Sequence, residues 1–530
     1  MSNDVVVVVG SGPSGAGAAA QLASRGVRVV ILDAGPREPG GWVVKAGGNT
    51  LYRRFDNSLY STDRLADDSD QDVYWASSLS LGGLSNYWTS AVPRFAPDDF
   101  TDGARLDERY RWPVSYDDVE PWYGLAEADL VVTAGNPIAG VPDNEARYRG
   151  KLPADWRAVR DANANGGEPV GLIPLAKGKR WMVARRAAEY SSYHCVVAPL
   201  ERDGRVELVR GAHVSHLEWS ATEGRVVRAV YVDEGGQEQA IECSAVVLAA
   251  GTVDSTMIAL RSRSEDFPDG LGNAHGLVGR YLHDHPRDWW VGVTDQPLTA
   301  PAHPVYVARE PFEDSEPLLA TSLTIGLTAL RNPRQRLRTF YGGRTDRFGV
   351  QVFGTMVPRP EIGVSLSGDH ESDPRNARPT VRLSYEQPEV TNVTAARERF
   401  RHALAAAGIG VELPDHVDDL SPGSSVHMSG TMRMHDDPQF GVIDRWSRMH
   451  DAPNVIVADM SSFTTGPEKN PTLTSMALAR RAADRLADDL GHPPASSLPS
   501  AGSDASGPLQ GLRSKLTGAG RHQNPAGRSA

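Results

Sequence analysis

The chain has 530 residues, 40% of them hydrophobic and 23% charged, and its formal net charge is -12. This composition is that of an ordinary globular protein with about two to four domains, and the negative charge disfavours nucleic acid or an anionic membrane as partner. No apolar run reaches the roughly 18 residues of a membrane span, the N-terminus lacks a leader-like segment, and Cys195 and Cys243 are too few for a disulfide framework. The sequence therefore predicts a soluble cytoplasmic protein with buried free thiols.

Residues 4–33 contain two β-branched apolar runs separated by a glycine-rich turn and an alanine-rich helical pattern. Strand, turn, helix and strand in this order predict a dinucleotide-binding unit. Gly10 permits the tight turn, Gly12 lets a pyrophosphate approach the backbone, and Gly15 lets the helix pack closely on the strand. Asp33 would accept hydrogen bonds from a ribose diol, and its charge disfavours the 2′-phosphate of NADP.

The segment 80–95 reads SLGGLSNYWTSAVPRF. Beside a dinucleotide fold, Gly82 and Gly83 would let the backbone approach a flat ring, with Asn86 and Thr89 as its polar contacts. A packed loop without a ligand is the alternative interpretation.

Further apolar runs occur at 206–219, 225–233 and 245–250, far along the chain from the first strands. Buried strands this far apart indicate one sheet built from distant segments. Residues 287–385 alternate between apolar and polar side chains, which predicts a second, largely antiparallel sheet. The pattern at 392–407 is helical.

The predicted fold class is therefore α/β, with a Rossmann-like domain assembled from discontinuous segments and an inserted α+β domain for the substrate. The segments predicted for the cofactor domain are 1–95, 196–286 and 420–490, those for the substrate domain and its excursions are 96–195 and 287–419, and 491–530 is predicted to be a disordered tail.

In YLHDHP, His283 and His285 stand on either side of a carboxylate. A structural metal site usually needs four ligands, and no further ligand is nearby in the sequence, so no metal site is predicted. Arg433 and His450 are interpreted as structural residues.

The stretch 425–477 begins with SVHMSGTMRM around His427 and reaches NPTLTSMALA at Asn470. By itself His427 could be a core or turn histidine. However, Asn470 precedes Pro471 at the start of a helical pattern, where Asn is a good N-cap and Pro a good first residue. A helix N-terminus suits a group that becomes negative during turnover, such as a reduced flavin.

These blocks, in their order along the chain, resemble the glucose–methanol–choline (GMC) flavin oxidoreductases. The resemblance runs from Asp4 to about Leu490. The motifs GTMRM and NPTLT are most similar to those of pyranose oxidases and bacterial glycoside 3-oxidases. The matching blocks are GSGPSG with Asp33, LGGLSNYWT, RWPVSYDDVEPWY, AVVLAAGTVDS, GLVGRYLHDHP, HMSGTMRM and NVIVADMSSF…NPTLTSMALA.

The resemblance implies FAD as the dinucleotide. Its ADP half would lie on Gly10, Gly12, Gly15 and Asp33, its adenine beside the backbone of Val214, its isoalloxazine by Asn86 and Thr89, its ribityl–pyrophosphate stretch at Asp459, and its pyrimidine edge near the amides of Asn470, Pro471 and Thr472.

One position departs from the family pattern. Fungal pyranose oxidases carry a histidine covalently bonded to the flavin in the block that reads SNYWT here. The matching residue is Tyr87, so we expect FAD to be held without a covalent link.

The resemblance implies oxidation of a secondary hydroxyl of a sugar, glycoside or sugar-like polyol to a ketone. His427 would take the hydroxyl proton, hydride would pass to flavin N5, and Asn470 would orient the substrate oxygen. Electrons would then pass to O2, giving H2O2, or to another acceptor. Gln351 is a candidate substrate contact, and a surface glutamine is its alternative interpretation.

Three alternatives remain open at this stage: an oxidase or dehydrogenase for a non-sugar alcohol, a flavin-containing lyase of the same fold, and a non-catalytic nucleotide-binding protein. The sequence does not indicate the oligomeric state.

Overall fold

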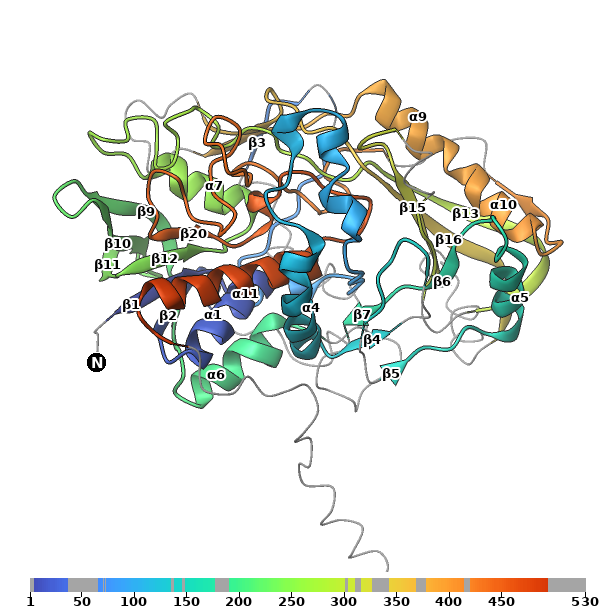
Figure 1. Cartoon of the computed structure of the whole chain (residues 1–530), viewed down its shortest axis with the longest axis horizontal. Helices are drawn as coiled ribbons and strands as arrows, with labels where there is room; N and C mark the ends of the chain where they lie inside the picture. Colours follow the sequence, from blue (N-terminus) through green and yellow to red (C-terminus); the bar gives the residue numbers. More distant parts are fainter. Residues whose placement is uncertain are drawn as a thin grey trace, which may run out of the picture.

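A computed structural model describes residues 4–36, 65–69, 71, 73–134, 138–144, 148–176, 190–300, 304–309, 316–326, 343–367, 378–413 and 420–493. The predicted tail, 491–530, lies outside the described residues beyond Pro493. Two sheets dominate the described part, one at either end of the long axis (Figure 1).

The first sheet is parallel and has five strands in the order β20-β12-β1-β2-β8. Most of its valine, isoleucine and leucine side chains are buried, as expected for a parallel sheet covered on both faces. Strands from distant segments pair here, which confirms the prediction for the run 245–250 and for the start of 206–219. The prediction is wrong for 225–233 and the rest of 206–219, because those residues form a separate antiparallel sheet. The strands are β1 (Val5–Val9), β2 (Arg28–Asp33), β8 (Glu207–Arg210), β12 (Ala245–Leu248) and β20 (Val455–Val457).

Three helices pack side by side next to this sheet: α1 (Pro13–Ser24), α11 (Thr472–Asp489) and α4 (Tyr116–Leu130). α11 lies between α1 and α4 (Figure 1). The predicted boundaries assign α4 to the substrate domain, but its buried residues Val119 and Tyr123 belong to the core of the parallel sheet.

Two further groups of elements extend this half of the molecule. A three-stranded antiparallel sheet has the order β11-β10-β9, and α7 packs against β9. The bounds are β9 (His213–Ser220), β10 (Arg225–Val232), β11 (Glu238–Glu242), α6 (Ala198–Arg202) and α7 (Thr252–Arg261).

The second large sheet is antiparallel and has six strands in the order β19-β13-β16-β15-β14-β6. Its pairing confirms the predicted antiparallel sheet. The strands are β6 (Val170–Leu172), β13 (Arg287–Thr299), β14 (Val305–Val307), β15 (Thr321–Gly326), β16 (Arg344–Gly354) and β19 (Val411–Glu412).

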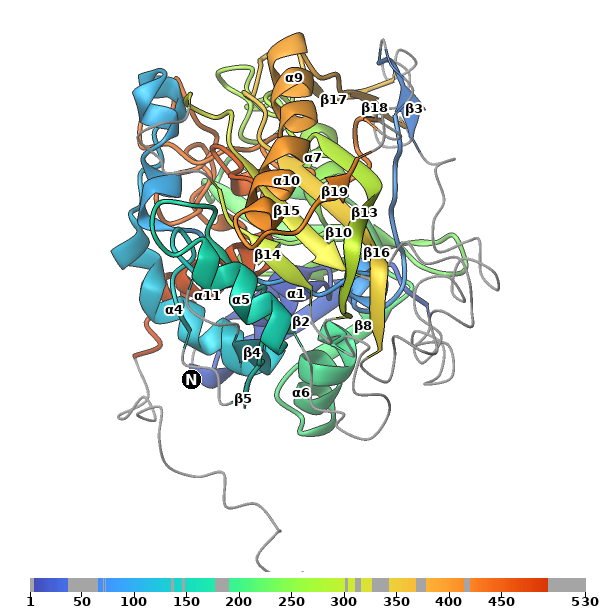
Figure 2. The same cartoon turned by 90° about the vertical axis from the view of Figure 1, so that its right-hand side faces the viewer.

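Helices α5 (Ala154–Ala162), α9 (Gln387–Ala395) and α10 (Arg397–Ala405) lie on one face of this sheet (Figure 2). The predicted helix at 392–407 is two helices in the structure, and the first begins earlier than predicted, at Gln387. Pro388 suits this start, and Glu386 and Glu389 form a capping box there.

Two small sheets complete the described part, in the orders β17-β18-β3 and β5-β4-β7. None of the helices described here has the length and apolar character needed to cross a membrane. The strands are β3 (Ala66–Asp67), β4 (Val132–Ala134), β5 (Tyr148–Arg149), β7 (Leu175–Ala176), β17 (Gly363–Leu366) and β18 (Pro379–Arg382).

Candidate active site

His427 lies in an irregular segment between β19 and β20, and the residue is largely buried with some accessible surface. Its backbone nitrogen donates to Oδ1 of Asp284 at 2.8 Å, and the hydroxyl of Ser425 donates to the same oxygen. Val426, directly before it, has φ of 59°, a left-handed conformation that is rare for a β-branched residue. Such strain is typical of functional segments held in place by their surroundings.

Asn470 meets His427 across a large separation in sequence. Nδ2 of Asn470 lies 3.2 Å from Nε2 of His427, 43 residues away. The expectation that Asn470 caps the following helix is wrong: α11 begins at Thr472, Pro471 occupies the cap position, and no side chain caps it. The amide cannot cap the helix because it is turned towards the imidazole.

A second histidine, His285, contacts His427 directly. Their Nδ1 atoms are 3.1 Å apart and their ring centroids 4.9 Å apart. The Phe353 ring of β16 contacts both imidazoles: its centroid lies 5.4 Å from that of His427 and 6.1 Å from that of His285. The site thus joins the loop of His427, the start of α11 and the antiparallel sheet.

From the sequence, His285 was a candidate only for metal binding. Its block GLVGRYLHDHP was matched to a family, but nothing in the spacing indicated a contact with His427. Within the described residues, no group of three or more His, Cys, Asp or Glu side chains could hold a metal ion.

Burial makes the histidines of this region weak bases. Burial lowers the pKa of His427 well below its usual value, and the neighbouring His285 and Arg287 lower it further. Burial also lowers the pKa of His285 to about 3 and that of His283 to about 4. His427 is therefore neutral near pH 7 and has a lone pair that can accept a proton.

The glycine turn after β1 is closely packed at Gly10 and Gly15 and open at Gly12, and we call it the glycine cradle. Gly10 has φ of +100°, and a Cβ on Gly15 would lie 2.1 Å from the carbonyl oxygen of Gly10, so neither position tolerates a side chain. A Cβ on Gly12 would meet nothing within 4 Å. The start of α1 therefore presents free N–H groups to an open space, which fits a pyrophosphate.

Asp33 and the loop of Gly82 organise this cradle. Oδ2 of Asp33 accepts from the backbone nitrogen of Ser11 at 2.7 Å and from its hydroxyl at 2.6 Å. The backbone nitrogen of Gly82 donates to the same hydroxyl at 2.8 Å, and a Cβ on Gly83 would meet only Cα of Gly12, at 3.8 Å. The glycine turn at residues 10–15 and the glycine pair Gly82–Gly83 are therefore neighbours in the structure.

Asn86 provides an unused acceptor at the same place. Its Nδ2 donates to the hydroxyl of Ser80 and to the carbonyl of Leu81. Its Oδ1 is buried, and none of the described residues donates to it. An open glycine cradle and an unsatisfied buried acceptor fit the binding of a dinucleotide.

Two other predicted cofactor contacts, Val214 and Thr89, lie in different surroundings. Val214 is on β9, near the point where the nitrogen of Ala212 donates to the carbonyl of Asp33 at 2.9 Å. Thr89 is exposed, whereas Tyr87 is buried. Their contacts with a cofactor stay predictions.

Asp459 has a visible role within the protein. Its carboxylate accepts from the backbone nitrogen of Gly251, the hydroxyl of Ser255, and the nitrogen and hydroxyl of Ser461. It therefore joins the start of α7 to the turn after β20, and its contact with a cofactor stays a prediction.

Gln351 lies on the face of β16 that carries Phe353, because side chains two residues apart in a strand point the same way. It pairs with Trp289 of β13 and Thr324 of β15. All three side chains are partly exposed, and they lie on the face opposite to the helices. They form a cross-strand row on the face that also carries Phe353.

A buried charge cluster directly precedes Asn470. Nζ of Lys469 lies 2.8 Å from Asp99 and 2.9 Å from Glu468, and Arg309 lies 3.2 Å from Asp99. The side chains of Lys469, Asp99 and Glu468 are fully buried. Burial by itself lowers the pKa of Lys469, but the attraction of both carboxylates outweighs it and the pKa is raised, so Lys469 stays charged.

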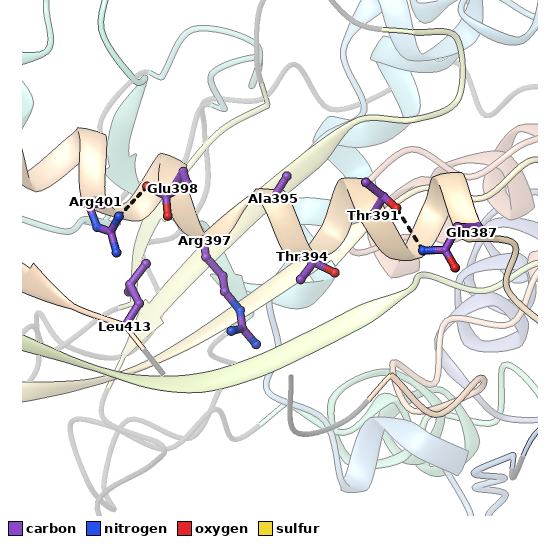
Figure 3. Close-up of a pocket in the computed structure, with 8 residues that line it drawn as sticks. All are labelled: Gln387, Thr391, Thr394, Ala395, Arg397, Glu398, Arg401 and Leu413. Carbon is purple, nitrogen blue, oxygen red and sulfur yellow. Dashed lines mark hydrogen bonds and ion pairs between the residues drawn. The ribbon is translucent and has the colours of Figure 1, made fainter. Parts of the chain in front are cut away.

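A recess runs along α9 and α10 (Figure 3). These helices cover the face of the six-stranded sheet opposite to the face that carries Phe353. Two pairs of residues that line the recess bond to each other: Arg401 with Glu398 at 2.8 Å, and Gln387 with Thr391 at 3.2 Å. It does not contribute to the site around His427.

Comparison with known proteins adds family matches. Residues 358–479 match the model described as GMC oxidoreductase, and residues 8–56 match an NAD(P)-binding Rossmann-like domain. The chain is 26% identical to 2-methyl-1,2-propanediol dehydrogenase of Mycolicibacterium austroafricanum, over 91% of this chain and 94% of that protein. It is 28% identical to paromamine 6'-oxidase of Streptomyces fradiae, over 92% and 91% respectively.

Among solved structures, the fold is similar to that of pyridoxine 4-oxidase from Mesorbium loti, with a TM-score of 0.62, 20% identity, and coverage of 91% of this chain and 99% of that one. Residues 358–479 thus form a GMC oxidoreductase domain, and these matches support an FAD-dependent alcohol oxidoreductase.

Proposed function

We propose that this chain oxidises a secondary hydroxyl of a sugar, glycoside or sugar-like polyol to a ketone, with His427 as general base. One observation supports it most directly: Nε2 of His427 and Nδ2 of Asn470 lie 3.2 Å apart. A substrate hydroxyl beside this pair could give its proton to the imidazole while its oxygen accepts a hydrogen bond from the amide.

His427 suits this role because it is neutral near pH 7, owing to burial and to the positive charge of Arg287. Proton removal makes the substrate oxygen negative, and the amide of Asn470 and the N-terminus of α11 would stabilise that charge.

When bound, FAD would supply the hydride acceptor and then pass the electrons to O2 or another acceptor. The residues that would hold it are those of the cradle: Gly10, Gly12, Gly15 and Asp33, together with Gly82, Gly83 and Asn86. The family histidine that bonds covalently to flavin is replaced by Tyr87, so we propose non-covalent binding. Acid denaturation of the purified protein should release its flavin completely into the supernatant.

The rest of the substrate would lie against Gln351, Trp289 and Thr324. In this cross-strand row the amide of Gln351 lies between the Trp289 ring and the Thr324 hydroxyl. An apolar surface next to hydrogen-bonding groups suits a ring bearing several hydroxyls. The relatives named above, one acting on a diol and one on paromamine, are consistent with a polyhydroxylated substrate.

The deciding experiment is anaerobic mixing of the purified protein with a panel of sugars, glycosides and polyols, followed near 450 nm. Bleaching by sugars or glycosides, with a ketone as product, supports the proposal. Bleaching only by simple alcohols points to a non-sugar substrate. A substrate that is cleaved without bleaching points to the lyase alternative. Readmission of air, with peroxide measured, distinguishes oxygen from another acceptor.

A further inference from the structure

We propose that His285 is a positioning residue that fixes the tautomer of His427, so that the lone pair of His427 is on Nε2, the nitrogen facing Asn470. The catalytic consequence rests on the proposed function, whereas the tautomer itself does not.

The contact between the two histidines requires one donor and one acceptor. Their Nδ1 atoms are 3.1 Å apart, so only one of the two can carry a hydrogen in that contact. The distance between the two Nδ1 atoms does not show which of them carries the hydrogen.

The amide of Asn470 decides between them. Nδ2 of Asn470 lies 3.2 Å from Nε2 of His427 and can only donate. Nε2 of His427 is therefore the acceptor in that contact and carries no hydrogen.

The remaining assignments follow by counting protons. A neutral imidazole carries one hydrogen, so Nδ1 of His285 is an acceptor and Nδ1 of His427 is the donor to it. The lone pair of neutral His427 is then on Nε2, next to the donor Nδ2 of Asn470 at 3.2 Å. Burial keeps both rings neutral near pH 7.

The surroundings hold the His285 ring in place for this contact. Its backbone nitrogen donates to the hydroxyl of Ser425 at 3.3 Å, and its carbonyl accepts from the hydroxyl of Tyr385 at 3.1 Å. When a proton arrives at Nε2 of His427, the Nδ1–H bond to His285 persists, so the base need not reorient during turnover.

The test uses the FAD-loaded protein labelled with ¹⁵N in its histidine rings, with the His427 signals identified by their absence in His427→Gln. NMR of the ring nitrogens should show hydrogen on Nδ1 and none on Nε2 in the wild type. His285→Leu should shift His427 towards the other tautomer or a mixture. His285→Asn places an amide oxygen near the former Nδ1 and should restore the wild-type pattern.

His283→Leu is the matched control, because His283 is buried in the same turn and no hydrogen bond joins its side chain to His427. It should leave the His427 tautomer unchanged. Wild-type His427 with hydrogen on Nε2, or a His285→Leu protein with the wild-type pattern, overturns the proposal.

Kinetics provide the second readout. His285→Leu should lower the rate of flavin reduction about 10- to 100-fold with KM nearly unchanged, since positioning groups of this kind carry effects of that size, and His285→Asn should recover most of it. An unchanged rate in His285→Leu also overturns the positioning role. If instead His427→Ala reduces flavin at the wild-type rate, the general-base proposal fails while the NMR result on the tautomer still stands.

Discussion

The hydroxyl oxygens of Ser14 and Ser475 lie 2.7 Å apart, although 461 residues separate them. Ser14 is in the first turn of α1 and Ser475 in the first turn of α11. The two helix N-termini therefore converge, and each contributes unpaired N–H groups and partial positive charge. The two ends of the described chain meet where a negatively charged cofactor would be stabilised.

The glycine cradle allows binding and folding to be separated. Gly12→Ala should fold normally, because its Cβ meets nothing within 4 Å, but the methyl group should occupy space needed by the pyrophosphate. We expect the Kd for FAD to rise about tenfold or more, equivalent to roughly 1.4 kcal/mol, measured by titrating the apoprotein with FAD. Gly15→Ala, whose Cβ would lie 2.1 Å from a carbonyl oxygen, should instead lower the urea midpoint. Wild-type affinity in Gly12→Ala would place the pyrophosphate elsewhere.

His427→Ala should slow anaerobic flavin reduction by about 10²–10⁴-fold, the usual contribution of a positioned general base. The visible spectrum and flavin content should stay those of the wild type, because none of the described cradle residues bonds to the His427 side chain. Loss of flavin from the variant would assign His427 a structural role instead.

Gln351→Ala should raise KM with little change in the limiting rate of flavin reduction, because a contact made equally to substrate and transition state affects binding alone. Its cross-strand neighbours suggest a companion, Trp289→Ala, with the same direction of effect. Stopped-flow reduction over a range of substrate concentrations separates the two parameters. An unchanged KM in both variants would remove this strand row from the substrate site.

The charge cluster before Asn470 should be costly to break. Lys469→Met leaves the buried carboxylates of Asp99 and Glu468 without their common cation, and we expect a loss of about 3–5 kcal/mol in the free energy of unfolding. Arg111→Ala, which removes an exposed pair with Glu108, is the control and should change stability little. Urea unfolding of both variants measures the difference, and equal stability would mean that the cluster contributes nothing net.

Stability should fall as the pH is lowered because His283 is buried in its neutral form. Burial lowers its pKa from 6.5 to about 4 in the folded protein, so the unfolded chain takes up the proton first. The stability is present above the unfolded value and is lost as pH falls through the window from about 6.5 to about 4.

Between pH 7 and pH 5 this histidine should account for about 2 kcal/mol of that loss. His283→Leu should therefore lose about that much less than the wild type over the same interval, as measured by urea unfolding at both pH values. Parallel losses in the two proteins would show that His283 is already accessible to protons in the folded state. The neighbouring Asp284 acts in the opposite direction, because burial raises its pKa to about 6, and it is common to both proteins.

The amino-acid sequence by itself determined the elements that depend on local interactions. The strand, glycine turn and helix at residues 4–25 could be predicted because apolar periodicity and the absence of Cβ atoms at Gly10 and Gly15 leave few alternatives. The second sheet could be predicted as antiparallel from its alternation, and the family resemblance drew attention to His427 and Asn470.

Only the tertiary structure decided which groups meet. The contact of His285 with His427, the strand face that carries Gln351 and the pairing of Lys469 with Asp99 join segments far apart in sequence, and no local pattern encodes such distances. The prediction that Asn470 caps the helix was wrong for the same reason. Local preference favours an amide as cap, but packing places a histidine within its reach, and that contact competes with the cap. The sequence determines which chemical groups the side chains carry. Their proximity, which gives these groups a function, arises only when distant segments pack into one core.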